Sequence, residues 1–85
     1  MKKATLVKML DGFQGDARLY VLDEPLDGNR HVVVSAAVVP YSGPETYIFA
    51  GTEDGEVGGW MELDGSYRGG LDHAEALRRA GYDCD

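Results

Sequence analysis

Apolar and polar residues alternate over several short segments of the chain, and Asp-Gly pairs separate these segments. Asp and Gly both tolerate the positive φ angles that tight hairpin turns require, so each pair indicates a turn. Alternation with a period of two is typical of strands, and the Val-rich segment 31–39, apolar on both faces, is typical of a central strand. The pattern predicts strands at residues 4–10, 17–22, 31–39, 46–50 and 57–63. The Asp-Gly pairs lie at 11–12, 27–28, 54–55 and 64–65.

One helix is predicted near the end of the chain, at about residues 72–80. Asp72 is placed to cap its N-terminus, and Glu75 three residues later completes a capping-box pattern. Gly81 follows as a left-handed stop signal. A helix this short is marginal alone, so we expect it to pack on the sheet. The stripe expected to face the sheet consists of Leu71, Ala74 and Leu77.

These elements predict an α+β fold, with a small antiparallel, meander-like β-sheet of four to five strands and one C-terminal helix packed on one face. The sheet is expected at about residues 4–63, a linker at 64–71 and the helix at about 72–80. All of them belong to a single domain, 1–85, because 85 residues cannot close a second core. The expected core residues are Val33, Val34, Ile48, Phe49, Trp60 and Leu77.

Charge is distributed unevenly along the chain. The chain has 8 Lys and Arg against 15 Asp and Glu, a net charge of −7, which disfavours direct binding of nucleic acid. Residues 31–67 hold six acids and no Lys or Arg. Such a segment either keeps the surface solvated or attracts a basic protein surface. The acidic candidates for interaction are Glu53, Asp54 and Glu56 at a predicted hairpin tip, with Glu62 and Asp64 after it.

Two aromatic residues have contrasting settings. Tyr41 lies in a loop with two prolines and a glycine, and loops on a rigid scaffold commonly carry recognition residues. Tyrosine is also enriched at interface hot spots, so Tyr41 is a sixth candidate interaction residue. Trp60 follows two glycines that leave room for an indole, and we expect it in the core rather than at an interface.

No constellation of catalytic residues stands out, and the sequence predicts a protein that is not an enzyme. Cys84 is the sole cysteine and lies close to the chain end, where we expect an exposed thiol rather than a nucleophile. His73 is expected on the helix surface, and His31 at a strand end. Asp23, Asp27 and Asn29 lack the ligand spacing of a calcium loop. We therefore expect no metal and no cofactor.

The single cysteine permits no intrachain disulfide and favours a cytoplasmic protein. Lys8 and Asp11 interrupt the segment that follows the basic start, so no export signal is predicted. The longest apolar run, 32–40, is too short to cross a bilayer, and we expect no membrane association.

Most of the chain resembles small proteins of actinobacterial phages, of the mycobacteriophage type. The resemblance rests on WMELDGSYRGG at 60–70, DHAEAL at 72–77 and AGY at 80–82, and extends to KKATLVKMLDGF at 2–13 and TYIFA at 46–50. It implies a phage or prophage gene expressed in a bacterial host cell. It assigns no activity and no catalytic residue.

Three functions follow as hypotheses. The first is a non-enzymatic protein that binds a host or phage protein through a sheet edge or its acidic surface. The second is a self-associating structural module, a homodimer, because the central strand needs more cover than one short helix provides. The third is an acidic competitor of a nucleic-acid-binding host protein.

Overall fold

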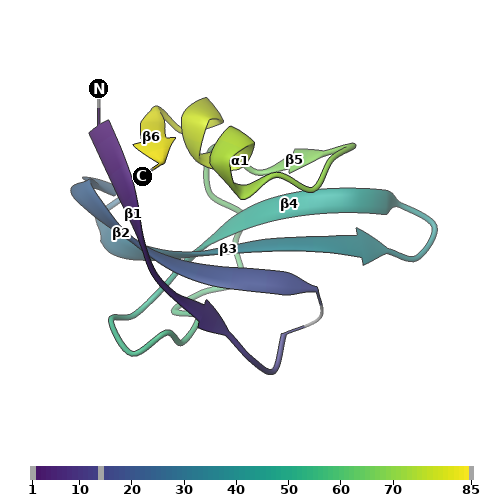
Figure 1. Cartoon of the computed structure of the whole chain (residues 1–85), viewed down its shortest axis with the longest axis horizontal. Coiled ribbons are helices and arrows are strands. Elements are labelled where there is room, and N and C mark those ends of the chain that lie inside the picture. Colours follow the sequence, from purple (N-terminus) through teal and green to yellow (C-terminus); the bar gives the residue numbers. More distant parts are fainter. Residues whose placement is uncertain (1, 14, 85) are drawn as a thin grey trace.

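The computed structural model describes residues 2–13 and 15–84, and it shows a small α+β fold with a curled sheet and one short helix (Figure 1). In the described residues the sheet has six strands, in the order β5-β4-β3-β2-β1-β6. The predicted count of four to five strands was therefore too low. The strands are β1 (Lys2–Leu10), β2 (Asp16–Leu26), β3 (Asn29–Val39), β4 (Gly43–Ala50), β5 (Tyr67–Arg68) and β6 (Tyr82–Cys84).

The first four strands form the predicted antiparallel meander in sequence order. The β2–β3 hairpin closes through Asp27 and Gly28, whose φ angles are 50° and 82°, as a two-residue turn with two left-handed positions requires. The valines of β3 alternate between the two faces, and Val33 and Val34 are both fully buried. The central position of β3 and the core role of both valines are thus confirmed.

Two short strands extend the sheet beyond the prediction. In β5, Arg68 pairs with Glu45 of β4, within the segment expected to be a linker. The other strand, β6, returns after the helix and pairs in parallel with β1, with Tyr82 opposite Lys2. Strands of two and three residues are too short to show an alternation, which is why the sequence pattern missed both.

The strand predicted at 57–63 does not form. The backbone N–H of Gly58 donates to Ala50 O at 2.7 Å, and that of Leu63 donates to Ile48 O at 2.8 Å. The two donors are five positions apart on this segment, whereas their two acceptors are only two positions apart on β4. Residues 59–62 therefore loop away from the edge of β4. In Figure 1 the segment after β4 passes below the sheet before the chain rises to β5.

The helix α1 (His73–Arg79) has Asp72 as N-cap, as predicted, and its C-cap Ala80 is followed by Gly81 at a φ angle of 99°, the predicted left-handed stop. Asp72 Oδ1 accepts a hydrogen bond from the Glu75 N–H at 3.1 Å. The reciprocal half of the capping box is absent in the described residues, because the Asp72 N–H donates to Thr46 Oγ1 at 3.2 Å. That bond fastens the start of the helix to β4.

The helix covers one face of the sheet, which we call the helix face (Figure 1). Leu77 is fully buried there, as predicted, but Leu71 is 50% exposed and Ala74 is also exposed. The predicted stripe was wrong for these two, because His73 and Ala76 turn toward the sheet instead. The buried cluster on this face comprises Ala4, Tyr20, Leu22, Leu26, Val32, Val34, Ile48, Ala76, Leu77 and Tyr82.

The opposite face, which we call the open face, carries a smaller core. Ala17, Leu19 and Val33 are buried there, and Leu10, Phe13 and Val57 pack against them. The expected core residue Phe49 is only partly buried, and Trp60 is 70% exposed. The prediction of a core Trp60 was therefore wrong, because the loop at 59–62 carries it outside this small cluster.

Candidate interaction surface

Four aromatic rings on the open face form a line in which each ring contacts the next. We call them the aromatic row: Phe13, Trp60, Phe49 and Tyr47. The ring centroids of Phe13 and Trp60 are 6.4 Å apart, those of Trp60 and Phe49 5.3 Å, and those of Phe49 and Tyr47 5.9 Å. The Trp60–Phe49 contact is T-shaped, with an interplanar angle of 65°, which aromatic quadrupoles favour.

Three separate segments assemble this row. Tyr47 and Phe49 are two residues apart on β4, so both point to the open face while Ile48 points to the helix face. The loop at 59–62 brings Trp60 against Phe49, and the β1–β2 connection brings Phe13 against Trp60. The two-residue spacing in β4 was the one signal in the sequence. Nothing in the sequence pattern connects Phe13 with Trp60.

The row is unusually accessible at Trp60, and the next residue, Met61, is 81% exposed. An indole provides a large apolar surface and one N–H donor, and tryptophan is enriched among interface hot spots. Adjacent exposed side chains of this size form an apolar patch rather than the single exposed apolar residues that any protein surface carries.

A charged cluster lies at the Tyr47 end of the aromatic row. Glu45 is only 4% exposed, and its Oε1 accepts a hydrogen bond from the Tyr47 hydroxyl. Arg68 Nε lies 3.3 Å from Glu45 Oε2, within ion-pair range, although no hydrogen bond to this oxygen forms among the described residues. The bond to Glu45 raises the pKa of Tyr47. The Tyr47 hydroxyl and then the charge of Glu45 raise the pKa of Arg68, and the charge of Glu62 acts more weakly in the same direction.

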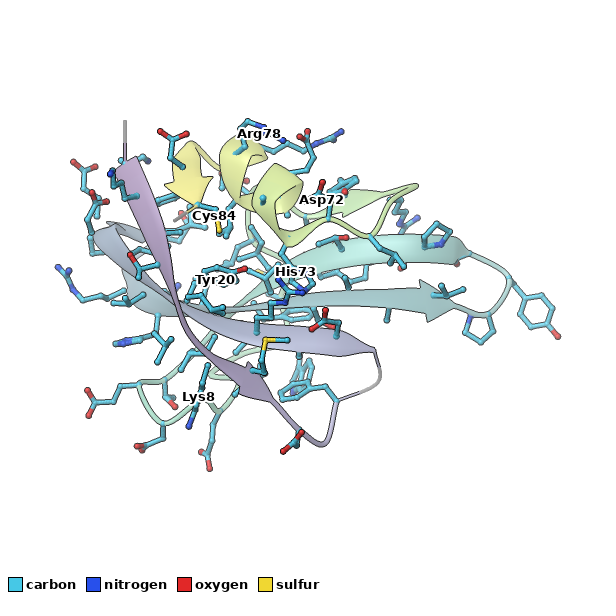
Figure 2. All side chains as sticks on the ribbon, viewed as in Figure 1. Lys8, Tyr20, Asp72, His73, Arg78 and Cys84 are labelled. Carbon is cyan, nitrogen blue, oxygen red and sulfur yellow. The ribbon has the colours of Figure 1, made fainter. Side chains whose placement is uncertain are left out.

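The predicted hairpin tip forms a tight turn that exposes Glu53, Asp54 and Glu56. The turn is closed by Gly55 N–H donating to Thr52 O at 3.0 Å and by Thr52 N–H donating to Glu56 O at 2.9 Å. It packs against β1, since a Cβ added to Gly55 would lie 2.8 Å from Leu10 Cδ2 and 3.0 Å from Lys8 Cε. Figure 2 shows Lys8 on this side of the sheet, so a cation lies against the acidic turn.

The other two candidates lie elsewhere. Asp64 is exposed, and the next residue, Gly65, lies against the helix, because a Cβ added to Gly65 would be 2.4 Å from the Ala76 carbonyl oxygen. Asp64 therefore lies on the helix side. Tyr41 is fully exposed at the β3–β4 connection and has a φ angle of 69°. This tip is at the opposite end of β4 from the acidic turn, roughly 25 Å away along the strand. The six predicted candidates therefore do not form one surface.

A polar cluster on the helix face was missed by sequence reasoning. Arg18 donates two hydrogen bonds to the Asp16 carboxylate, at 3.2 Å and 2.8 Å. His73, expected on the helix surface, is only 7% exposed and contacts the Asp16 carbonyl. Burial raises the pKa of Tyr20 to about 12, and the neighbouring Cys84 acts in the same direction. Figure 2 shows Tyr20 and His73 between the helix and the sheet, and Cys84 on β6 beside the helix.

The structure gives the remaining candidates structural contacts. Asp23 Oδ1 accepts a hydrogen bond from the Lys3 backbone N–H at 2.9 Å, and Asn29 Nδ2 donates to Leu26 O at 3.1 Å across the hairpin turn. His31 pairs with Val21 between β2 and β3.

No three potential metal ligands gather within residues 2–13 and 15–84. Over the same residues, no helix has the length and apolar content needed to cross a membrane.

Comparison of the chain with protein-family models, with curated proteins and with solved structures finds no match.

Proposed function

We propose that this chain is a small acidic, non-enzymatic module that binds a host or phage protein in a bacterial cytoplasm, through the open face. The observation that carries the proposal is the 70% exposure of Trp60 within a row of contacting aromatic rings. The rings of Phe13 and Phe49 both contact the indole, which restricts the rotamers open to it before a partner binds. Preorganised aromatic side chains bind with a small loss of conformational entropy.

The open edge of β1 is the competing surface. Beyond Ala4, no described strand pairs with the outer edge of β1, and Leu6, Val7 and Met9 are 41%, 48% and 56% exposed. The edge is interrupted by a register shift between Leu6 and Lys8. A bulge and a lysine on an edge strand are devices that prevent pairing with another strand. The open face is therefore the better binding surface.

Affinity capture tests the proposal. Wild-type protein, Trp60→Ala and Val38→Ala are immobilised in equal amounts and exposed to lysate of an actinobacterial host, and bound proteins are identified by mass spectrometry. Val38 is a matched control, because it is 62% exposed and pairs with Pro44 at the distal end of β4. We expect one or more proteins to be retained by wild type and Val38→Ala and lost with Trp60→Ala.

Retention of the same proteins by all three baits would contradict the proposal. The unfolding midpoint of each bait is measured first, so that a loss of binding is compared only among folded proteins. Light scattering after size-exclusion chromatography distinguishes the homodimer hypothesis. If wild type is a dimer and Trp60→Ala a monomer, the open face serves self-association rather than a separate partner.

A further inference from the structure

We propose that the aromatic row receives an arginine-bearing segment of the partner, an inference that rests on the proposed function and specifies its chemistry. The first reason is the nature of the exposed ring. The π face of an indole carries partial negative charge and binds cations more strongly than the rings of tyrosine or phenylalanine. Since 70% of Trp60 is exposed, most of the indole surface is accessible to a cation.

The second reason is charge complementarity. Glu53, Asp54, Glu56 and Glu62 are exposed on the segment that runs from β4 to the row and past it. Of the described cations, Lys8 lies against the acidic turn and Arg68 is already paired with Glu45. The segment therefore retains an excess of negative charge beside the aromatic row, which a cationic partner segment neutralises.

Other described cations are engaged away from the open face. Arg18 pairs with Asp16, and both Arg78 and Arg79 pair with Glu75. Lys2 Nζ lies 4.7 Å from the centroid of the Tyr82 ring. Arg30 donates to the Leu22 and Asp23 carbonyls. None of these contacts supplies positive charge to the aromatic row, so the excess of acid there is left for a partner.

The third reason is the fit of a guanidinium to a ring with carboxylates beside it. A guanidinium is planar, stacks on aromatic rings and offers several N–H donors in one plane, whereas an ammonium is a point charge. This chain already contains such a site on its other side. Arg79 Cζ lies 4.3 Å from the centroid of the Tyr67 ring while Arg79 Nε donates to Glu75 at 3.0 Å. Trp60, with the exposed Glu62 two residues later, offers a ring and a carboxylate of the same kinds.

Tryptophan fluorescence provides a direct test, because Trp60 is the sole tryptophan of the chain. The full-length protein is titrated with a capped Arg-Gly-Arg-Gly-Arg peptide and with the same peptide in which citrulline, which is uncharged, replaces each arginine. We expect a saturable change of Trp60 emission with the arginine peptide alone. Binding should weaken roughly 3- to 10-fold when salt is raised from about 20 mM to about 300 mM, because screening reduces the attraction.

Matched charge variants identify the site. We expect Glu62→Gln to weaken arginine-peptide binding roughly 2- to 5-fold, because one carboxylate beside the row is removed. Glu24→Gln removes the same charge from the distal end of β2 and should leave binding unchanged. Phe13→Leu removes a ring that supports Trp60 and should weaken binding by a similar factor to Glu62→Gln.

Equal emission changes with the citrulline peptide, or equal weakening by Glu62→Gln and Glu24→Gln, would overturn the arginine inference. The two proposals fail separately. If captured proteins depend on Trp60 but the arginine peptide does not bind, the binding function stands and the arginine specificity is wrong. If the arginine peptide binds at Trp60 but captured proteins are the same for wild type and Trp60→Ala, the binding function is wrong as stated.

Discussion

The Nε2 atom of His73 lies 2.8 Å from the backbone carbonyl oxygen of Asp16, 57 residues earlier in the chain. A carbonyl oxygen only accepts hydrogen bonds, so Nε2 carries the hydrogen and donates it. The histidine is 7% exposed, which shields this bond from water. The contact fastens the first turn of α1 to the start of β2, across the helix face.

Loss of this contact should destabilise the fold. We expect His73→Ala to lower the free energy of unfolding by about 1–3 kcal/mol, because the part-buried Asp16 carbonyl loses its donor. Urea unfolding followed by circular dichroism measures the change. His73→Gln retains an amide donor and should lose less. An unchanged urea midpoint in His73→Ala would show that the bond contributes nothing to stability.

The Asp16 carboxylate should make stability fall in acid. The hydrogen bonds from Arg18, and more weakly the charge of His73, lower the pKa of Asp16 from its ordinary value of 3.8. Because the pKa of Asp16 is lower in the folded protein than in the unfolded chain, the unfolded chain binds this proton at a higher pH. The stabilisation is therefore complete above the ordinary value and is lost as pH falls through the folded pKa.

Asp16→Asn removes this titration, so its urea midpoint should decline less than that of wild type between about pH 5 and about pH 2. The difference should be small, because the Asp16 side chain is 43% exposed and solvent screens the pair. Parallel pH profiles for the two proteins would mean that the Arg18 contact does not favour the charged carboxylate.

Two leucines of the helix region provide a matched pair for testing how the helix packs. Leu77 is fully buried and Leu71 is 50% exposed. We expect Leu77→Ala to cost about 2–4 kcal/mol and Leu71→Ala about 0.5 kcal/mol or less. Thermal or urea unfolding measures both. Equal costs would place the helix in a different rotation about its axis.

Trp60 should behave as a solvent-exposed indole in the native protein. Acrylamide should quench its emission in the folded protein nearly as well as in urea, since 70% of the side chain is exposed. Trp60→Ala should change the free energy of unfolding by about 1 kcal/mol or less, as expected for a surface residue. Strong protection from quenching, or a loss typical of core truncation, would place Trp60 in the interior.

Local interactions were readable from the sequence. The Asp27-Gly28 turn depends on two residues that tolerate positive φ, and the Asp72 cap on a side chain three residues from its donor. The meander of β1 to β4 follows from the turns and from the alternation between them. The exposed acidic turn at Glu53, Asp54 and Glu56 also follows from this local chemistry. Each of these features is determined within a few residues.

The position of Trp60 was not readable, because it depends on competition for the edge of β4. The Leu63 N–H donates to the Ile48 carbonyl, and the Ile48 N–H donates to the Ser66 hydroxyl oxygen. The Gly69 N–H donates to the Pro44 carbonyl. Once these groups are satisfied, residues 59–62 have no partner on the edge and loop out. A hydrophobic pattern does not show which of several segments will hydrogen-bond to the edge of β4.

The sequence by itself determined the turns, the helix with its caps, the meander and the acidic character of the segment after β4. Only the tertiary structure decided the rotation of the helix, the parallel pairing of β6 with β1 and the aromatic row. The helix is rotated so that His73 reaches Asp16, and the row joins Phe13 to Trp60 from a distant segment. Such contacts form only after the meander has brought remote residues together, and their energies do not appear in any local pattern.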